Sequence, residues 1–572
     1  MKMVNLKIDN VNVSVPAGTS ILDAAKEAGI KIPTLCYHPD MPFTASCRLC
    51  LVQIKGKRKL QPSCATPVKE NMEVITNNPM IREARKTALE LLLANHPMEC
   101  PVCIKNNKCE LQRLAQELNI TDITFEKCSD MLPIDDQNPA IVREPNKCVK
   151  CGRCVEVCHE VQTVGAINTA YRSGEYNVCT AFQKPLAESE CVFCGQCVNV
   201  CPVGAIYEKD DTQKVWDALN DPDKFVIVQT APAIRASLGE EFGMDPGSLV
   251  TGQMVTALRN LGFDRVFDTD FTADLTIIEE GNELLERLEN NGVLPMITSC
   301  SPGWINFIEK FYPELLQHLS SCKSPQQMFG ALAKTYYAQK ENISPEKMFV
   351  VSVMPCTAKK YEAARPEMNS SGYRDVDVVL TTRELGRMLK EAGINLAILE
   401  PGKFDEPLGI STGAGAIFGT SGGVMEAALR TVYEVVTGKE LENIDFTDVR
   451  GLEGIKEAEV DIDGTKIKIA VANSLKNARE LLEMVKSGKG DYKFIEVMCC
   501  PGGCIGGGGQ PYGTNNETKQ KRMQAIYKED KNMKIRKSHK NPAVCELYED
   551  FLGKPLGYKS HKLLHTYYTP KK

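Results

Sequence analysis

The sequence lacks the features that mark membrane, exported and nucleic-acid-binding proteins. No segment approaches the roughly 18 consecutive apolar residues that a membrane span needs. The first residues, MKMVNLKIDNVNVSV, do not show the basic-then-apolar order of a signal peptide. A net charge of −6 gives no strong field to attract nucleic acid or an anionic membrane. We therefore expect a cytoplasmic protein with neither a membrane nor a nucleic-acid partner.

Cysteine is the residue in excess, with 24 in 572 residues. Disulfides do not persist in a reducing cytosol, so metal ligation is the expected role of most of these thiols. A chain of this length is also expected to divide into several domains, each with its own core. The sequence thus predicts a multidomain metalloprotein.

Changes of pattern along the chain predict five segments of mixed α/β and α+β character. Residues 1–80 show the order of hairpin, helix and further strand that is typical of a β-grasp domain, and residues 81–125 show two helices with one His and three Cys between them. Residues 126–209 hold a duplicated cysteine run. Residues 210–515 alternate apolar strands with helical patterns, which predicts parallel sheets covered by helices. Residues 516–572 are predicted to be a Lys-rich helical segment that wraps the large domain.

The duplicated run, CVKCGRCVEVC and CVFCGQCVNVCPVGA, repeats the spacing C-x2-C-x2-C-x3-C. This spacing is typical of ferredoxins with two 4Fe-4S clusters, in which the fourth Cys of each run ligates the other cluster. Two zinc sites are the weaker alternative, because eight cysteines in this doubled spacing are nearly diagnostic of clusters. The predicted ligand sets are Cys148, Cys151, Cys154 and Cys201 for one cluster, and Cys191, Cys194, Cys197 and Cys158 for the other.

Four more cysteines lie within the predicted β-grasp segment. Their gaps resemble the plant-type ferredoxin layout with a stretched first gap, which indicates a 2Fe-2S cluster. A four-cysteine zinc site is the alternative, although the order of strands and helix favours ferredoxin. The predicted ligands are Cys36, Cys47, Cys50 and Cys64.

A third 4Fe-4S site is predicted on one imidazole and three thiolates. An imidazole ligand tends to raise the potential of a cluster, and its protonation can couple electron flow to pH. A zinc site is chemically as good in isolation, so the interpretation depends on the neighbouring clusters. The predicted ligands are His96, Cys100, Cys103 and Cys109. The first 209 residues leave the function open, because the same module order opens electron-input subunits of respiratory NADH dehydrogenases and some formate dehydrogenases.

Three cysteine-bearing segments of the large domain follow predicted strands: PMITSCSPGW, VSVMPCTAKK and EVMCCPGGCIGGGGQP. Open α/β sheets bind ligands beyond the carboxyl ends of their strands, so these segments could converge on one buried metal site. Each cysteine taken singly could instead be a core thiol. The Gly-rich run lacks the Lys-Ser/Thr of a P-loop, so it indicates a close approach of the backbone to something bulky.

These three motifs and the four-module N-terminus together resemble the iron-only (FeFe) hydrogenases of the clostridial ferredoxin-linked type, over essentially the whole chain. The resemblance implies reversible reduction of protons to H2 at an H-cluster, a 4Fe-4S cubane joined through a cysteine sulfur to a di-iron centre with CO, CN and a dithiolate amine. It also implies three accessory 4Fe-4S clusters and one 2Fe-2S cluster. The implied partners are ferredoxin or flavodoxin as electron carrier, and hydrogenase maturation proteins.

The resemblance also assigns residues to the H-cluster. Cys356, Cys500 and Cys504 would be ligands, with Cys504 shared with the di-iron unit. Lys359 would donate a hydrogen bond to a cyanide, as a cation opposite an anionic ligand should. For the two methionines of the implied pocket, plain core packing is the alternative. The implied pocket residues are Met354, Met498, Phe418 and Ala233, the last at a position where many relatives carry Ser.

The first motif departs from the family pattern TSCCPxW, in which the first Cys is the proton relay and the second a cubane ligand. Here the pair is Cys300 and Ser301. Either Ser301 ligates the cubane, or Cys300 moves into the ligand role, or the additional Cys499 substitutes. The sequence leaves the fourth ligand and the relay open.

A proton path is also implied, on Glu280, Glu283, Arg287 and Ser320. The two glutamates and the arginine are spaced three and four apart, which places them on one helical face and suits a hydrogen-bonded chain. A solvated charged face is the alternative.

Two other functions remain in view. An H2-sensing regulatory protein with the same cofactor could show an altered relay motif, and a dehydrogenase subunit could share the N-terminal modules. The remaining cysteines have no ligand spacing, and we predict buried structural thiols at Cys128, Cys179, Cys322 and Cys545.

Overall fold

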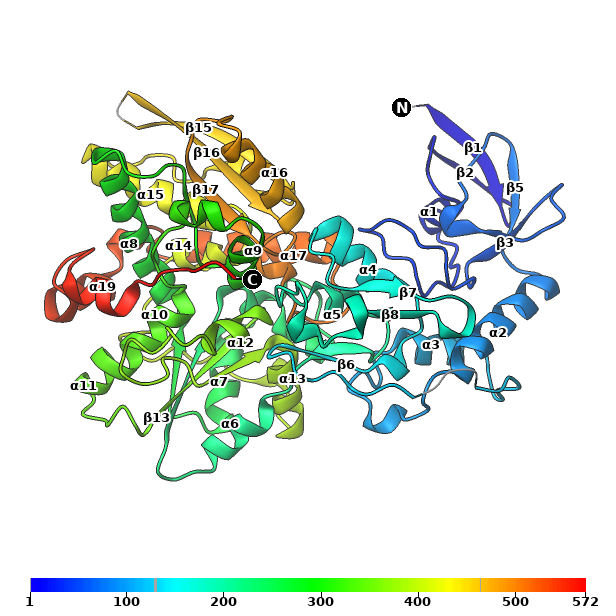
Figure 1. Ribbon diagram of the computed structural model, residues 1–572, viewed down its shortest axis with the longest axis horizontal. Coiled ribbons are helices and arrows are strands. Elements are labelled where there is room, and N and C mark those ends of the chain that lie inside the picture. Colours follow the sequence, from blue (N-terminus) through cyan, green and yellow to red (C-terminus); the bar gives the residue numbers. More distant parts are fainter. Residues whose placement is uncertain (1, 128–130, 463, 572) are drawn as a thin grey trace. The chain divides into compact units, whose positions relative to one another are not determined.

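The structure is a computed structural model that describes residues 2–127, 131–462 and 464–571. The chain forms two compact units (Figure 1), which we name the N-terminal unit and the C-terminal unit. The N-terminal unit comprises residues 1–161, 165–189 and 200–207, and the C-terminal unit comprises residues 162–164, 190–199 and 208–572. Residues 190–199, from the second cysteine run, therefore group with the later part of the chain.

The N-terminal unit begins with a mixed five-stranded sheet of order β2-β1-β5-β3-β4. Exposed and buried residues alternate along β1, which directs Val4, Leu6 and Ile8 to one face, where they pack with helix α1. The Oγ of Ser20 accepts the Asp23 N–H and so caps α1. The elements are β1 (Met3–Ile8), β2 (Val11–Pro16), α1 (Ile21–Glu27), β3 (Leu51–Ile54), β4 (Gln61–Pro62) and β5 (Met72–Ile75).

The rest of this unit consists of short helices and two-stranded sheets that carry the cysteine loops. The sheets are β6 with β9, and the antiparallel pair β7 and β8. The elements are α2 (Pro79–Ala94), α3 (Glu110–Glu117), β6 (Ile141–Arg143), α4 (Arg153–Glu156), β7 (Asn168–Ala170), β8 (Asn177–Cys179) and β9 (Ile206–Glu208). Helix α5 (Gln196–Val200) lies within the second cysteine run, and all but its last residue group with the C-terminal unit.

The C-terminal unit contains two four-stranded sheets. The first, of order β11-β10-β13-β14, is parallel throughout, and the second, of order β12-β17-β16-β15, pairs β12, β17 and β16 in parallel. Strands such as β10 and β13 are almost continuously apolar because both of their faces are buried. The strands are β10 (Phe225–Thr230), β11 (Arg265–Asp268), β12 (Met296–Ile297), β13 (Met348–Met354), β14 (Val378–Thr381), β15 (Ile455–Ile462), β16 (Thr465–Asn473) and β17 (Tyr492–Met498).

Helices cover both sheets. The second sheet contacts α15 and α16, which flank it in Figure 1. The main helices are α6 (Thr212–Leu219), α7 (Thr251–Leu261), α8 (Thr269–Glu289), α9 (Pro302–Phe311), α10 (Pro325–Leu332), α12 (Ala358–Ala363), α13 (Thr382–Glu391), α15 (Gly423–Thr437), α16 (Leu475–Lys486), α17 (Asn516–Asn532), α18 (Pro542–Leu547) and α19 (Tyr558–Leu564). Among the described residues, no helix combines the length and apolar composition that a membrane crossing requires.

Parallel sheets are therefore present in the large domain as predicted, with one departure. Strand β15 was not expected, and it pairs with β16 in an antiparallel hairpin at the edge of the second sheet. Its residues alternate between exposed and less exposed positions, because an edge strand with one open face does not need a continuous apolar run.

A buried ion-pair network ties α17 to α15. The side chains of Arg430, Glu426 and Asp530 are fully buried, and the Arg430 guanidinium lies 2.7 Å from Glu426 and 2.9 Å from Asp530. Arg450 and Arg536 also pair with these carboxylates. Buried charges are tolerated only when they are paired in this way.

Substituting Arg430 should therefore destabilise the C-terminal unit. In Arg430→Met the volume is nearly kept, but two buried carboxylates lose one partner each, so we expect the free energy of unfolding to fall by about 3 kcal/mol. Calorimetry of the full chain measures this as a lowered unfolding temperature. The control Lys521→Met breaks an exposed pair with Glu517 on α17 and should cost under about 0.5 kcal/mol. Equal effects of the two substitutions would contradict the assignment.

Candidate functional site

The first predicted cluster site lies within the N-terminal unit. Four cysteines line one cavity whose wall is otherwise largely apolar: Cys148, Cys151, Cys154 and Cys201. Burial raises the pKa of Cys148 to about 11 and raises that of Cys151 further. Such thiols stay neutral unless a metal stabilises the thiolate, so this donor set fits an iron–sulfur cluster. The cavity also joins Cys201 to the trio from the other run, as the crossed ligation requires.

The second set is divided between the units. Cys191, Cys194 and Cys197 belong to the C-terminal unit, whereas Cys158 belongs to the N-terminal unit, so its ligation of this cluster stays a prediction. Cys191 and Cys197 are buried. The Cys191 carbonyl accepts hydrogen bonds from Asn306 and Lys310 of α9, which fixes this loop against the large domain.

The four cysteines of the β-grasp segment are all buried, and they approach one another in pairs. The Cys50 and Cys64 sulfurs are 3.4 Å apart, and the Cys36 and Cys47 thiols are hydrogen-bonded. The burial of all four thiols, close together in pairs, fits ligation of a metal cluster.

His96 carries an unpartnered buried atom. Its Nδ1 has no hydrogen-bond partner among the described residues. Burial, with Lys147 nearby, lowers the pKa of His96 to about 4, so the imidazole is neutral at pH 7. A neutral imidazole with a free nitrogen is the form that ligates metals. Cys100, Cys103 and Cys109 are only partly buried.

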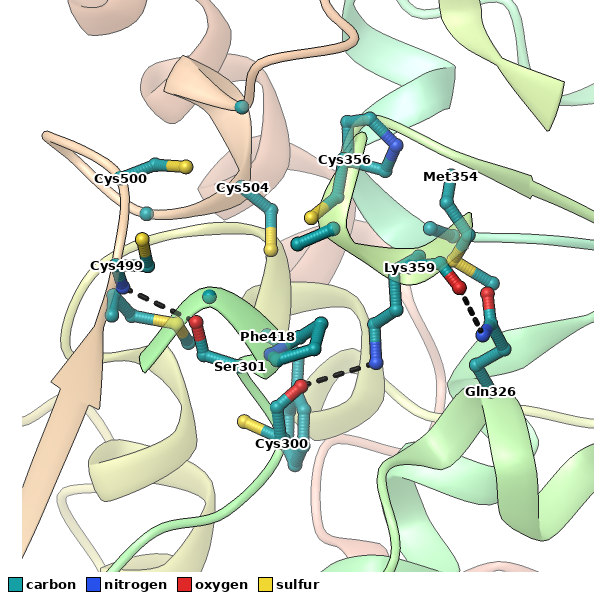
Figure 2. A pocket seen from close by; sticks show the side chains of 18 of the residues that line it. Cys300, Ser301, Gln326, Met354, Cys356, Lys359, Phe418, Cys499, Cys500 and Cys504 are labelled. Atoms are coloured by element: carbon teal, nitrogen blue, oxygen red, sulfur yellow. Dashed lines mark hydrogen bonds between the residues drawn. The ribbon is translucent and has the colours of Figure 1, made fainter. Parts of the chain in front are cut away.

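The three motifs of the large domain meet at one cavity of about 80 Å³ in the C-terminal unit (Figure 2). Cys300 and Ser301 lie between β12 and α9, Cys356 follows β13, and Cys499 and Cys500 directly follow β17. The cavity is far larger than the ~10–15 Å³ that one water needs. Strand ends from two different sheets therefore build a common, sulfur-lined site, which also includes Cys504, Met354, Met498, Phe418 and Lys359.

The Gly-rich run allows this convergence. A Cβ on Gly507 would lie 2.0 Å from the Pro355 carbonyl oxygen, and one on Gly508 would lie 2.3 Å from the Cys194 carbonyl oxygen. Only glycine permits the backbone to pass so close. The run thus approaches the backbone of the loop after β13 and the backbone of the second cysteine run.

Lys359 is the one cationic side chain among the described residues that line the cavity. Its Nζ donates to the Cys300 carbonyl at 3.1 Å and pairs with Glu362 at 2.9 Å. Burial raises the pKa of Cys504 to about 12 and also raises that of Cys356, while the lysine charge opposes both shifts. The cavity thus suits an anionic, sulfur-ligated group held beside one ammonium.

Ala233 lies next to the cavity wall. It is fully buried, it follows the lining residues Ala231 and Pro232, and it is close to Gly419, the neighbour of Phe418. Its predicted role at the pocket therefore stays a prediction.

The predicted proton-path residues lie together. Glu280 is buried and contacts Ser320, the Ser320 Oγ donates to Glu283 at 3.0 Å, and Glu283 pairs with Arg287 at 2.7 Å. Cys300 is close enough for Glu280 to raise the pKa of its thiol. The Arg287 side chain is 16% exposed, so this end of the chain of residues reaches solvent.

Several residues of the site were not predicted. Glu362 orients Lys359, and its position one helical turn later could have been read from the sequence. Ser321 donates to Glu283 and contacts the His565 Nδ1 at 2.8 Å. His565 comes from the far end of the chain, and no local spacing could have indicated it.

The remaining cysteines are only partly as predicted. Cys179 and Cys322 are buried, but the prediction is wrong for Cys545, which is exposed. Helix α18 buries Ala543, Val544 and Leu547, which leaves Cys545 on its outer side. Cys128 lies outside the described residues.

Fold and sites together define the class of iron–sulfur redox proteins with an accessory cysteine-rich unit. Comparisons with known families then identify the modules. Residues 224–508 match the iron only hydrogenase large subunit, C-terminal domain. The other matches are the 2Fe-2S iron-sulfur cluster binding domain (1–79), the NADH-ubiquinone oxidoreductase-G iron-sulfur binding region (85–124), the 4Fe-4S dicluster domain (147–205) and the iron hydrogenase small subunit (516–571).

Individual relatives agree. The chain is 52% identical to the NADP-reducing hydrogenase subunit HndD of Solidesulfovibrio fructosivorans, over 99% of each chain. It is 42% identical to iron hydrogenase 1 of Clostridium pasteurianum, over 99% of this chain and 100% of that protein. A solved apo FeFe-hydrogenase from Chlamydomonas reinhardtii aligns with a TM-score of 0.56 and 46% identity, covering 62% of this chain and 98% of that one. The chain belongs to the FeFe (iron-only) hydrogenase family.

Glu280 should be a neutral acid at pH 7. Burial, and then the charge of Glu283, raises its pKa to about 8, so it should ionise only as the pH rises through about 8. Between its ordinary value and 8 the folded state binds the extra proton, so this group's contribution to stability falls as the pH rises. Infrared difference spectroscopy of wild type against Glu280→Gln should reveal a protonated-carboxyl stretch with that titration midpoint.

Glu279 is the matched control for this measurement. It is equally buried on the same helix, but hydrogen bonds from His565, Ser560 and Tyr548 lower its pKa. Glu279→Gln should leave the protonated-carboxyl band in place. A band that survives in Glu280→Gln would show that another residue carries the proton.

Proposed function

We propose that this chain is an iron hydrogenase that catalyses the reversible reduction of protons to H2, with electrons supplied through its accessory iron–sulfur clusters. The observation that carries the proposal is the meeting of Cys356, Cys500 and Cys504 in one buried cavity beside Lys359. Family membership points to the same activity.

The residues present fit an H-cluster. Its cubane would be held by Cys356, Cys500 and Cys504, with Cys504 shared with a di-iron unit that carries CO, CN and a dithiolate amine. When bound, this group supplies the iron site at which electrons and protons combine to H2. Lys359 would donate a charge-assisted hydrogen bond to a cyanide. Met354, Met498 and Phe418 line the cavity and would keep water from it.

The chain's own residues would move the proton. Cys300 would hold it at the cavity, and Glu280, Ser320 and Glu283 would carry it between the cavity and the solvent near Arg287. The Arg287 guanidinium stays charged and would orient Glu283 by their ion pair. A neutral Glu280 is both a donor and, after loss of its proton, an acceptor, which suits a relay between a thiol and a carboxylate. Such a path would favour turnover over the alternative of an H2 sensor.

Electrons would enter through one 2Fe-2S and three 4Fe-4S clusters. Ferredoxin or flavodoxin in the cytoplasm would be the carrier, and maturation proteins would supply the di-iron unit. Because one relative is named as a subunit of an NADP-reducing hydrogenase, a partner subunit that handles NADP is the alternative electron source.

Infrared spectroscopy of the anaerobically matured protein tests the cofactor directly, because CO and CN stretches have no protein background. We expect these bands together with H2 evolution from reduced ferredoxin, and no evolution from NADPH when the chain is alone. Absence of the bands after maturation in cells that load a known FeFe hydrogenase would overturn the proposal.

Glu283→Gln tests the proton path. Loss of a positioned acid–base group typically costs about 10²–10⁴-fold in rate, so H2 evolution should fall by that order while the infrared bands persist. Glu286→Gln is the matched control, because Glu286 is exposed on the same helix and should retain nearly full activity. Equal rates in the two variants would remove Glu283 from the path.

A further inference from the structure

A cubane takes four cysteine ligands, and the three motifs offer only three at the positions discussed so far. The first motif presents Ser301 where a fourth thiolate is expected. Assuming the proposed function, we propose that Cys499 supplies the fourth thiolate of the cubane and that Ser301 is a positioning residue for Cys499.

Cys499 has the required location. It is 4% exposed and lines the same cavity as Cys356, Cys500 and Cys504. Its thiol is within hydrogen-bonding reach of the Cys500 thiol. Figure 2 shows Cys499 beside Ser301, on the side of the cavity where Cys500 lies. The fourth cubane ligand would thus come from the loop after β17 rather than from the loop after β12.

The first motif leaves space for the Cys499 sulfur. A Cβ on Gly303, near the start of α9, would lie 2.7 Å from the Cys499 Sγ. Any larger residue there would displace the sulfur, so the glycine keeps this volume free. The β12 loop and the β17 loop are therefore complementary at the Cys499 sulfur.

Ser301 is already engaged in holding Cys499. Its Oγ accepts the Cys499 N–H at 3.2 Å, although Ser301 is the N-cap residue of α9 and would ordinarily bond its own helix. A hydroxyl is also a harder ligand than the thiolates that iron–sulfur clusters select. The serine thus fixes the backbone that carries the neighbouring thiol.

Cys300 is placed for a different role. Its carbonyl is held by Lys359, and Figure 2 shows its side chain well apart from Cys356 and Cys500. It lies near Glu280, at the start of the proton path. The relay position is therefore kept while the ligand position has moved to another loop.

The new ligand position has an electronic consequence. The Cys499 thiol is also within hydrogen-bonding reach of Cys194, a predicted ligand of the adjoining ferredoxin-type cluster. A cubane ligand at Cys499 would touch a ligand of the cluster that delivers electrons, without an intervening residue.

The test uses full-length protein made without maturation proteins, so that it carries cubanes but no di-iron unit. Iron and sulfide per chain and the electron paramagnetic resonance spectrum are measured after anaerobic reconstitution. Cys499→Ala should lose about four iron and four sulfide per chain, and Cys499→Ser should lose the same cluster or change its spectrum. Ser301→Ala, Cys300→Ala and the control Cys179→Ala, which removes a buried thiol of the N-terminal unit, should retain the full complement.

Two results would overturn the ligand assignment: an unchanged cluster content and spectrum in both Cys499 variants, or loss of the cubane in Cys300→Ala. A Ser301→Ala spectrum identical to that of the wild type would reject the positioning role of Ser301. The infrared bands of the matured wild type decide the proposed function separately. Bands in wild type with unaltered Cys499 variants would reject only the ligand, whereas wild type without bands would reject the function.

Discussion

The C-terminal unit is organised around the cost of burying several thiols where one ammonium group is the only cationic partner among the described lining residues. Thiolates in such a place are unfavourable unless a metal holds them, and the raised pKa values of Cys356 and Cys504 express that cost. Lys359 offsets part of the charge, and Glu362 in turn fixes the lysine. Sheets, glycine loops and capped helices bring these groups together at strand ends.

The same constraint explains what the sequence could predict. Cluster ligands are close in sequence when one loop wraps a cluster, so spacing alone indicated the set from Cys148 to Cys154. Cys201 could be added because a known geometry crosses the two runs. The three motifs of the large domain could be placed at strand ends because parallel strands present their carboxyl ends to a ligand. The apolar strands that precede the motifs make these strand ends easy to locate in the sequence.

Other features depend on contacts between distant segments, which no local pattern records. His565 meets Glu283 through Ser321, and Ala233 lies close to Gly419. Strand β15 escaped prediction because three of its eight residues are exposed at a sheet edge and interrupt any apolar run. The sequence showed Ser301 in place of a family cysteine and an additional cysteine at Cys499. The proposed relation between the two residues depends on the hydrogen bond from the Cys499 N–H to the Ser301 Oγ, which only the structure records.

Drawing the site from two sheets affects the order of events during synthesis. Cys356 and Cys504 are separated by almost 150 residues, so a ribosome working at about 5–20 residues per second leaves roughly 7–30 s between them. During that interval the earlier thiol has no complete ligand set to join. Metal insertion at this centre must therefore wait until both loops have left the ribosome. Until then the thiol of Cys356 is exposed to any oxidant that the growing chain meets.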